Sequence, residues 1–445
     1  MTLQWLFQRF HDHATDEAVI WRGKSIRYGE LLERTQAAQT FLAEQRVQPG
    51  EAVVIDADYS PGSIALLMAT IANRNIVVPI AAHVKSDRER YAEIGEANWY
   101  FKVLPDDRYE GHSYSREMKH PFNLGLKNQG SPGLILFSSG STGEPKASLH
   151  NLDFLLAKYQ VQRNSQRILA FLLFDHIGGF NTLFYTLSNH GCVIALEARD
   201  AVSVCAAIER HRAHVLPTSP TFLNLLLMSE AWRDYNLSSL RLITYGTEAM
   251  PQATLRKLNE IFPHIRFLQT YGLSELGILR SKSRSSDSLW VKVGGEDYET
   301  RVVAGMLHIR AKSSMVGYLN APSPFDEDGW FNTQDEVDVE GEWLRFKGRK
   351  SDIINVGGEK VYPAEVESVI LEVDNVIDTT VSKEPHPITG NIVVANIALR
   401  TMEPAREVAR RVQAYCLTRL PRYKVPVKVY VADSNRVTER FKKQR

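Results

Sequence analysis

The chain has 445 residues, of which 44% are hydrophobic and 24% are charged, and this length is enough for roughly two to three domains with buried cores. Its 53 Lys and Arg residues against 52 Asp and Glu residues leave a net charge of +1, which argues against the bulk basic field of nucleic-acid-binding and membrane-surface proteins. Its three scattered cysteines argue against a disulfide framework and against a zinc cluster.

The apolar runs of the chain are short. The longest of them fall far short of the ~18 residues that span a bilayer. The first residues, MTLQWLFQRFHDH, lack the basic end and clean apolar run of a signal peptide. We therefore expect a cytoplasmic protein without a membrane span, and no binding of nucleic acid.

Through about the first three quarters of the chain, apolar runs rich in Val, Ile and Leu alternate with amphipathic stretches. Helices are predicted at residues 28–44 and 201–211, and buried strands at residues 52–55, 134–137, 193–196 and 242–245. Buried strands that alternate with helices predict mostly parallel sheets with helices on both faces. The fold class is therefore α/β.

The pattern changes from about Gly294. Short alternating segments at residues 300–303, 306–310 and 343–346 predict antiparallel hairpins. After a polar break at residues 348–351, a small α+β unit is predicted, with helices near residues 364–371 and 403–420 and strands near 376–382 and 392–399. We expect a large domain over residues 1–348 and a small domain over residues 349–445.

The strongest local motif is LILFSSGSTGEPK at residues 134–146, where a buried strand enters a loop of hydroxyls and glycines. The loop contains Ser138, Ser139, Gly140, Ser141, Thr142, Gly143 and Lys146. Glycine lets backbone N–H groups approach an anion, hydroxyls donate to phosphate oxygens, and lysine adds charge. Only two residues separate the glycines and Pro145 precedes Lys146, so the loop is not that of a P-loop NTPase. Phosphate binding is favoured over a flexible linker.

Three further segments add groups that suit a nucleotide. In TYGLSE, the ring of Tyr271 is able to stack on a base and Glu275 to hold Mg²⁺ beside phosphates. GWFNTQD ends in Asp335, a carboxylate that accepts from ribose hydroxyls. GRKSDIINVGGEK at residues 348–360 opens the small domain. Each segment alone equally fits a structural explanation: a buried tyrosine, a turn, or a basic surface loop.

Taken in order, SSGSTGEPK, YGLSE, GWFNTQD and GRKSD followed by EVE resemble the adenylate-forming superfamily of acyl- and aryl-CoA synthetases, luciferases and adenylation domains of peptide synthetases. The resemblance covers nearly the whole chain. It implies that ATP and a carboxylate react in the large domain to give an acyl-adenylate, after which the small, mobile domain rotates and a thiol attacks. It also implies a small distorted β-barrel at the end of the large domain.

The resemblance implies specific nucleotide contacts. Residues 138–146 would wrap the β- and γ-phosphates, Thr142 and Glu275 would position Mg²⁺, and Asp335 with Arg349 would bind the ribose. The adenine slot would be formed by Gly246, Thr247, Glu248, Tyr271, Gly272 and Ser274.

The family's catalytic lysine falls on Lys442 in the segment RVTERFK at residues 436–442. Arg436 and Phe441 replace the usual proline and glycine, so a basic tail without catalytic function stays an alternative, and Lys443 is a neighbouring candidate. Ser351 matches the hinge position, and Gly357 with Gly358 would line the thiol tunnel. Gln334 stands where the family has glycine, so either the turn is reshaped or the backbone there does not need positive φ.

The acyl pocket would be bordered by the segment FLLFDHIGGF. Its expected residues are Phe174, His176, Gly178, Gly179, Tyr245, Gly246 and Gly277, with His176 meeting or gating the carboxylate. A strand end with a structural histidine is an equally simple interpretation. The segment that binds an α-ammonium in amino-acid-activating relatives has no evident acid here, which favours an aryl or fatty acid.

The leading hypothesis is an ATP-dependent acid–thiol ligase with Mg²⁺ as cofactor. The acceptor would be CoA or the phosphopantetheine of a separate carrier protein, since no carrier domain is evident in the chain. The alternatives are a ligase that passes the acyl group to an amine or another nitrogen nucleophile, and a non-catalytic relative that binds nucleotide or acyl ligand. The identity of the acid and the oligomeric state, monomer or homodimer, stay open.

Overall fold

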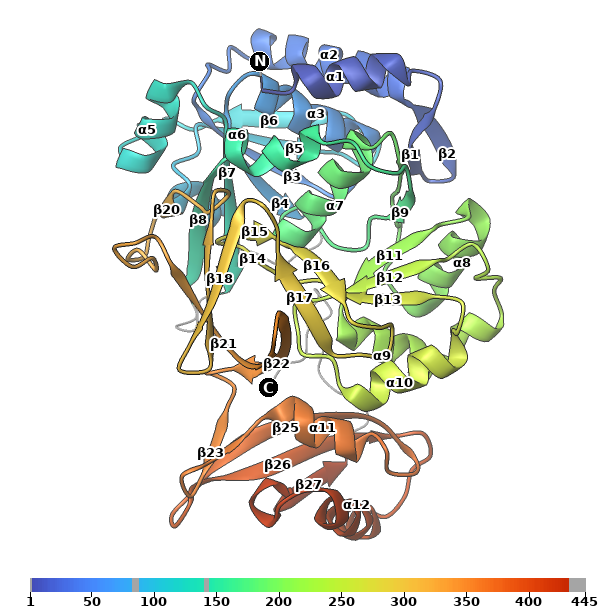
Figure 1. The fold of residues 1–445 in the computed structure, drawn as a ribbon. Coiled ribbons are helices and arrows are strands. Elements are labelled where there is room, and N and C mark those ends of the chain that lie inside the picture. Colours follow the sequence, from blue (N-terminus) through green and yellow to red (C-terminus); the bar gives the residue numbers. More distant parts are fainter. Residues whose placement is uncertain (1, 82–87, 140–143, 432–445) are drawn as a thin grey trace.

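The computed structural model of the protein describes residues 2–81, 88–139 and 144–431 (Figure 1). Within these residues, a large N-terminal domain contains two seven-stranded sheets, a six-stranded antiparallel sheet and their covering helices. A smaller C-terminal domain lies below it in Figure 1.

The first seven-stranded sheet carries both arms of the predicted phosphate loop. Its spatial order is β20 (Gly317–Tyr318), β8 (Pro145–Asn151), β7 (Gly133–Ser139), β4 (Ile76–Ala81), β3 (Ala52–Ala57), β5 (Trp99–Val103) and β6 (Tyr109–Ser113). The inner strands β7, β4, β3 and β5 run parallel, and every residue of β3 and β4 is buried. This burial explains their continuous apolar sequences. The antiparallel pair β7 and β8 places Ser138 opposite Lys146.

The second seven-stranded sheet is parallel apart from one hairpin. Its order is β13 (Arg266–Gln269), β12 (Leu242–Tyr245), β11 (Val215–Thr218), β9 (Arg167–Leu169), β10 (Cys192–Ile194), β1 (Glu17–Trp21) and β2 (Lys24–Arg27), with β1 and β2 antiparallel. Strands β12 and β13 pair in register up to Tyr245 and Gln269. The segments that follow them therefore leave the sheet at the same edge, where α/β folds place ligands.

Helices cover both sheets. They are α1 (Gln4–Asp12), α2 (Tyr28–Glu44), α3 (Pro61–Ala72), α4 (Arg88–Ile94), α5 (Pro121–Gln129), α6 (Leu152–Ala157), α7 (Ile177–Ser188), α8 (Ala201–His211), α9 (Pro220–Ser229) and α10 (Gln252–Ile261), with short turns η1 (Lys158–Gln160) and η2 (Ala231–Arg233). Helix α3 begins at a capping box in which Ser60 and Ser63 bond reciprocally, followed by proline at the first position. One core joins α3 and α7 with Val53 of the first sheet and Val193 of the second.

The third sheet is antiparallel and links the two domains. Its order is β16 (Arg280–Ser283), β17 (Trp290–Gly294), β22 (Trp343–Arg349), β21 (Phe331–Glu340), β19 (Met306–Ala311) and β18 (Tyr298–Val303), beside the small pair β14 (Gly272–Leu273) and β15 (Gly277–Ile278). Its core includes Phe331 and Leu344 packed with Tyr271. The predicted nucleotide segment at residue 271 is therefore fixed against this sheet.

The C-terminal domain has its own core. It contains β23 (Ile354–Val356), β24 (Glu359–Val361), α11 (Pro363–Ile370), β25 (Val376–His386), β26 (Gly390–Leu399), α12 (Ala405–Arg419), η3 (Arg422–Lys424) and β27 (Lys428–Val431). Helix α11 faces α10 of the large domain, and β25 approaches α9 (Figure 1).

The structure confirms the α/β class, with a large N-terminal domain of parallel sheets and a smaller C-terminal domain. The two helices predicted at residues 28–44 and 201–211 begin and end at those residues. The domain boundary between residues 348 and 349 stays a prediction, and β22 runs across it. None of the helices in the described residues is both long and apolar enough to cross a membrane.

Candidate active site

Asp335 is the centre of the cluster that the fold assembles from the predicted nucleotide residues. The hydroxyl of Tyr271 donates to Asp335 Oδ2 at 2.6 Å, and Arg349 Nε donates to Oδ1 at 3.2 Å. Asp335 and Arg349 are register partners on β21 and β22, whereas Tyr271 arrives from the loop after β13. Burial raises the pKa of Asp335, and the Arg349 guanidinium opposes that rise. Both carboxylate oxygens are thus held before any ligand binds.

The ring of Tyr271 stacks on Phe346, with centroids 4.5 Å apart and planes inclined by 16°. Sequence reasoning did not single out Phe346, because its position in an alternating strand carries no local mark of this contact. The stacking orients the hydroxyl of Tyr271 toward Asp335. Burial also raises the pKa of Tyr271 far above its usual value, so the phenol stays a donor.

Gln334, which replaces a family glycine, adopts φ of 60°. The turn therefore keeps a left-handed residue, and glutamine takes that conformation at a cost of roughly 1 kcal/mol. Neighbouring side chains stabilise the turn: Asn332 Oδ1 accepts from the Gln334 N–H, and Thr333 Oγ1 accepts from the Asp335 N–H. The alternative that the backbone does not need positive φ at this position is therefore wrong.

Glu275 and Lys146 meet at Tyr318, a residue that sequence reasoning also missed. The Tyr318 hydroxyl donates to Glu275 Oε1 at 2.5 Å, and Lys146 Nζ lies 5.4 Å from the centroid of the same ring. The contact spans 43 positions in the chain. Strand β20 brings Tyr318 to this place by pairing with β8, opposite Ser148. Burial and the nearby Glu275 carboxylate raise the pKa of Tyr318.

Asn320 makes two hydrogen bonds to the backbone of β8, where the chain leaves the predicted phosphate loop. Its Oδ1 accepts from the Ala147 N–H at 2.9 Å, and its Nδ2 donates to the Pro145 carbonyl at 2.8 Å. Ser138 and Lys146 are both half-buried at the loop's two ends. The loop residues Gly140, Ser141, Thr142 and Gly143 lie outside the described residues, and of Ser139 only the backbone is described. The whole segment 436–442 with Lys442, and Lys443 beyond it, also lies outside them.

His150 supports the segment that precedes Glu275. Its Nε2 donates to the Ser274 carbonyl at 2.6 Å, and the side chain is fully buried. Burial lowers the pKa of His150 to about 4, so the imidazole is neutral at physiological pH. No local pattern indicates this contact, because His150 and Ser274 are 124 positions apart.

The segments after β12 and β13 are bonded to each other at the predicted adenine slot. The Thr270 N–H donates to the Tyr245 carbonyl at 2.8 Å. A Cβ on Gly246 would lie 2.8 Å from both the carbonyl and the hydroxyl oxygen of Thr270, so this close approach requires glycine. Glu248 accepts from the Thr221 hydroxyl at 2.5 Å. The structure thus brings Gly246 beside Thr270, whereas Glu248 contacts α9.

The predicted acyl wall lies at the start of α7. His176 caps this helix, and its Nδ1 accepts from the Gly178 N–H at 3.2 Å. Asp175, its neighbour in sequence, is buried and accepts from the Ala81 N–H at 3.2 Å. A Cβ on Gly179 would lie 1.9 Å from the Leu173 carbonyl oxygen, so the absence of a side chain there serves backbone packing.

The remaining predicted pocket residues lie just before α7, at the end of β12 and on β15. Phe174 is buried against the ring of Tyr59, with centroids 5.6 Å apart. Tyr245 is buried at the end of β12, and Gly277, with φ of 84°, is buried on β15.

The predicted hinge and thiol-tunnel residues are exposed. Ser351 donates to its neighbour Asp352 at 2.9 Å, directly after β22. Gly357 and Gly358 form the turn between β23 and β24, with φ of 61° and 93°, values that favour glycine. Ser351 thus follows Arg349, the register partner of Asp335, by two residues, and its role as a hinge stays a prediction, as do the roles of Gly357 and Gly358.

Glu336 joins the large domain to the segment after the predicted hinge. The Tyr362 hydroxyl donates to its Oε1 at 2.6 Å, and Lys360 Nζ donates to its Oε2 at 2.9 Å. Lys347, on the neighbouring strand, approaches Oε1 at 3.4 Å. Hydrogen bonds to Tyr362 and Lys360 keep the pKa of Glu336 below its usual value despite partial burial.

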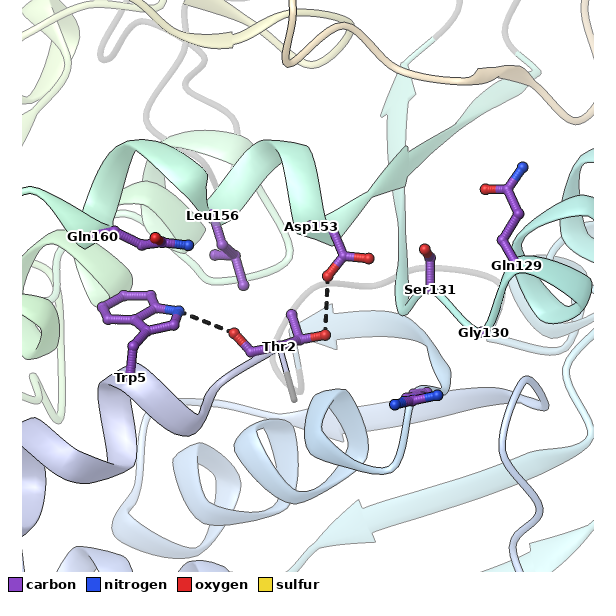
Figure 2. Close-up of a pocket in the computed structure, with 9 residues that line it drawn as sticks. Thr2, Trp5, Gln129, Gly130, Ser131, Asp153, Leu156 and Gln160 are labelled. Atoms are coloured by element: carbon purple, nitrogen blue, oxygen red, sulfur yellow. Dashed lines mark hydrogen bonds between the residues drawn. The ribbon is translucent and has the colours of Figure 1, made fainter.

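A separate pocket of about 450 Å³ lies near the other end of the β7–β8 pair (Figure 2). In it, the Thr2 hydroxyl donates to Asp153 Oδ1 at 2.9 Å, and Trp5 Nε1 donates to the Thr2 carbonyl at 2.9 Å. Gly130 and Ser131, just before β7, complete one side. None of the predicted site residues lines this pocket.

Comparisons with known proteins agree with these observations. A sequence profile described as AMP-binding enzyme matches residues 103–318, and one described as AMP-binding enzyme C-terminal domain matches residues 365–442. The two matched regions make up about two thirds of the chain.

Among curated relatives, the indoleacetate–CoA ligase of Aromatoleum aromaticum is 28% identical over 329 residues, which is 68% of this chain and 64% of the relative. The alignment thus spans less than two thirds of that enzyme. Two solved structures share the fold. One is the anthranilate CoA ligase AuaEII with anthranoyl-AMP, with a TM-score of 0.85 and 19% sequence identity. That match covers 99% of this chain and 95% of AuaEII. The other is the amide bond synthetase McbA of Marinactinospora thermotolerans, with a TM-score of 0.80 and 21% sequence identity. That match covers 98% of this chain and 96% of McbA.

Proposed function

Because the chain belongs to the AMP-binding enzyme family, we propose that it activates a small carboxylic acid with ATP and transfers the acyl group to a thiol. The observation that carries the proposal is the convergence of Tyr271 and Arg349 on the buried Asp335, within a domain that also brings Glu275 and Lys146 to one tyrosine. Carboxylate, cation and aromatic ring are the groups that a nucleotide needs for its ribose, phosphates and base.

In this proposal Asp335 accepts hydrogen bonds from the ribose hydroxyls, and Arg349 keeps the carboxylate ionised. Adenine lies between Tyr271 with its following residues and the wall at Gly246, Thr247 and Glu248. Gly246 approaches Thr270 closely, which keeps the slot between the two walls narrow and suits a flat base.

The phosphates would bind at the loop between β7 and β8, with Ser138 and Lys146 at its two ends. Glu275 offers a hard carboxylate oxygen of the kind that Mg²⁺ prefers, and Tyr318 already fixes the orientation of that carboxylate. Glu275 therefore fits a magnesium site, to which the family resemblance adds Thr142. The ion would neutralise charge on the phosphates.

The first step forms a bond between a carboxylate oxygen of the acid and the α-phosphorus of ATP, and it breaks the bond from that phosphorus to pyrophosphate. Two anions must approach each other, so cations and donors aimed at the developing charge lower the barrier. Lys146 and the predicted Lys442 supply this charge. In the second step the thiol sulfur bonds to the acyl carbon, its proton is lost, and AMP leaves.

The acid would lie beside α7, with His176 at its entrance. We propose an aryl or fatty acid, because the described walls at Phe174 and Tyr245 are aromatic and buried. The names of two similar proteins, an indoleacetate–CoA ligase and an anthranilate CoA ligase, support the aryl class. The acceptor would be CoA or a carrier-protein phosphopantetheine, reached past Gly357 and Gly358 once the C-terminal domain turns at Ser351.

Pyrophosphate release tests the proposal. The protein is incubated with ATP, Mg²⁺ and panels of aryl, fatty and amino acids, with hydroxylamine as a general acceptor. We expect release that depends on one class of acid. Adding CoA, phosphopantetheinylated carrier protein or an amine in place of hydroxylamine then identifies the acceptor. If the protein binds ATP but releases no pyrophosphate with any acid of the panels, the proposal is contradicted and a non-catalytic relative is favoured.

A further inference from the structure

A second cavity, of about 750 Å³, opens on the six-stranded antiparallel sheet and is unusually rich in positive charge. Its lining includes five cationic side chains and a single acidic one: Arg163, Arg280, Lys282, Lys292, Arg301 and Glu342. We call it the cationic cavity. None of the candidate nucleotide, acyl or hinge residues lines it, so the cavity is distinct from the proposed active site.

The cations of this sheet fall into two groups. Six of the eight Lys and Arg residues on its strands have an acidic partner within ion-pair distance: Lys292, Arg301, Arg310, Arg345, Lys347 and Arg349. Within the described residues, Arg280 and Lys282 have none. Both lie on β16 and line the cavity. The two cations of the sheet that have no acidic partner among the described residues therefore both line this cavity, beside the paired Lys292 and Arg301.

A third cation without an acidic partner among the described residues approaches from another part of the chain. Arg163 lies in the segment between η1 and β9, more than 100 positions before β16, and lines the same cavity. Three uncompensated cations around one hollow repel each other, at a cost that a bound anion would remove. Glu342 does not provide this compensation, because its carboxylate already binds Lys292.

The rest of the wall is partly apolar. Val302 and Val339 line the cavity and are 37% and 52% exposed, and the buried Leu307 and Leu344 form its floor. On one side, Gly294 and Gly295 leave the wall without side chains. Apolar walls with a few fixed charges are typical of small-molecule sites, and the volume lies within the ~300–1,000 Å³ of such sites.

We propose that the cationic cavity binds a small organic anion that carries at least two negative groups on an apolar body. Arg280 and Lys282 contact one anionic group and Arg163 the other, while Val302 and Val339 pack on the body. The three cations select for charge number, and the valines exclude a fully hydrated inorganic ion. The inference stands apart from the proposed function, since it uses none of the same residues.

Calorimetric titration with naphthalene disulfonate tests the proposal on the full chain, with AMP and Mg²⁺ in excess to keep the probe from the nucleotide site. The double variant Arg280→Gln, Lys282→Gln should bind the probe at least about tenfold more weakly, because a lost charge-assisted contact of ~1.4 kcal/mol corresponds to tenfold. Both side chains are exposed, so folding should be unaffected. Raising the salt concentration should weaken binding to the wild-type protein.

Arg310→Gln is the matched control. Arg310 lies on the same sheet, pairs with Glu299 and does not line the cavity, so its loss should leave the affinity unchanged. Val339→Glu provides a second variant. The acid that it places on the wall should weaken binding of the probe as strongly as the double variant does. The proposal would be overturned if the dissociation constant of the disulfonate stayed unchanged in both the double variant and Val339→Glu. Sulfate binding as tightly as the disulfonate would also overturn it.

Discussion

The cluster around Asp335 and the contact between the two domains are both polar, yet they are built differently. In the cluster, Asp335 and Glu275 each receive a hydrogen bond from a tyrosine of another segment of the large domain. The domain contact instead uses scattered pairs, such as Asn224 with Asp378 at 2.8 Å and the exposed pair of Arg400 with Glu230 at 3.0 Å. Exposed ion pairs contribute ~0–1 kcal/mol each.

The difference indicates a division of labour. Apart from Arg349, at the predicted domain boundary, the candidate nucleotide groups are held by contacts within the large domain, so ATP binding should survive changes beyond residue 349. If the C-terminal domain turns as proposed, it must break these pairs, including the buried bond between Asn224 and Asp378, and form others. Substitutions in the two regions should therefore affect different measurements.

The largest expected effect comes from the C-terminal side. Lys442→Ala should lower the rate of pyrophosphate release about a hundredfold to a thousandfold, since one positioned charge on the reacting groups is removed. ATP affinity should stay nearly constant, because the large-domain cluster is intact. Lys443→Ala is the matched control and should retain activity. A defect in Lys443→Ala with a normal Lys442→Ala would move the catalytic role to the neighbouring lysine.

Asp335→Asn should break the cluster itself. It removes the charge that Arg349 contacts and that the ribose would use, so ATP binding by calorimetry should weaken about a hundredfold, or roughly 3 kcal/mol. Asp338→Asn, on the same strand and paired with Arg345, is the control and should leave ATP binding unchanged. An unaltered affinity in Asp335→Asn would remove this carboxylate from the ribose site.

The buried His150 makes the large domain sensitive to acid. Its pKa is about 4 when folded and near 6.5 when unfolded, so the unfolded state binds more protons between these values. The free energy of unfolding should therefore fall by roughly 3 kcal/mol as the pH drops from 6.5 to 4. Urea unfolding at several pH values measures this slope. His150→Gln should flatten it, while the exposed His112→Gln should not; equal slopes in both variants would refute the assignment.

Tyr318→Phe should loosen one oxygen of Glu275 and leave the ring beneath Lys146. We expect ATP binding to become about tenfold weaker at low Mg²⁺ concentration and to recover partly when Mg²⁺ is raised, because Glu275 is less well oriented. Tyr298→Phe, which removes another half-buried hydroxyl bonded to Ser313, is the control. The same Mg²⁺ dependence in both variants would show a general loss of stability instead.

The smallest effect is expected at the domain contact. Glu336→Gln weakens the bonds to Lys360 and Tyr362, so hydrogen exchange in β24 should become about fivefold faster, or roughly 1 kcal/mol. ATP affinity should not change. Glu340→Gln, on the same strand and paired with Arg284, serves as control. Exchange in β24 that stays as slow as in the wild-type protein would mean that Glu336 does not hold this segment.

Local patterns predicted the fold well, and long-range contacts explain what they missed. The helix at residues 201–211 was predicted to the residue from its amphipathic pattern, and in the structure Asp200 caps its start. Asp335 and Arg349 were foreseen from motifs, and antiparallel pairing places them opposite each other. Tyr318 and His150 were not, because their partners are far away in the chain. The left-handed conformation of Gln334 is a different case, because the turn is stabilised locally: Asn332 accepts from the N–H two residues on, an Asx-turn that the sequence analysis did not use.

The most direct test of the central claim follows one oxygen atom. The protein is given ATP, Mg²⁺, a thiol acceptor and an acid of the active class whose carboxylate carries heavy oxygen, and the products are analysed by mass spectrometry. If the carboxylate attacks the α-phosphorus, AMP acquires one labelled oxygen and pyrophosphate none. Label in inorganic phosphate with formation of ADP, or unlabelled AMP beside a thioester, would contradict an acyl-adenylate intermediate.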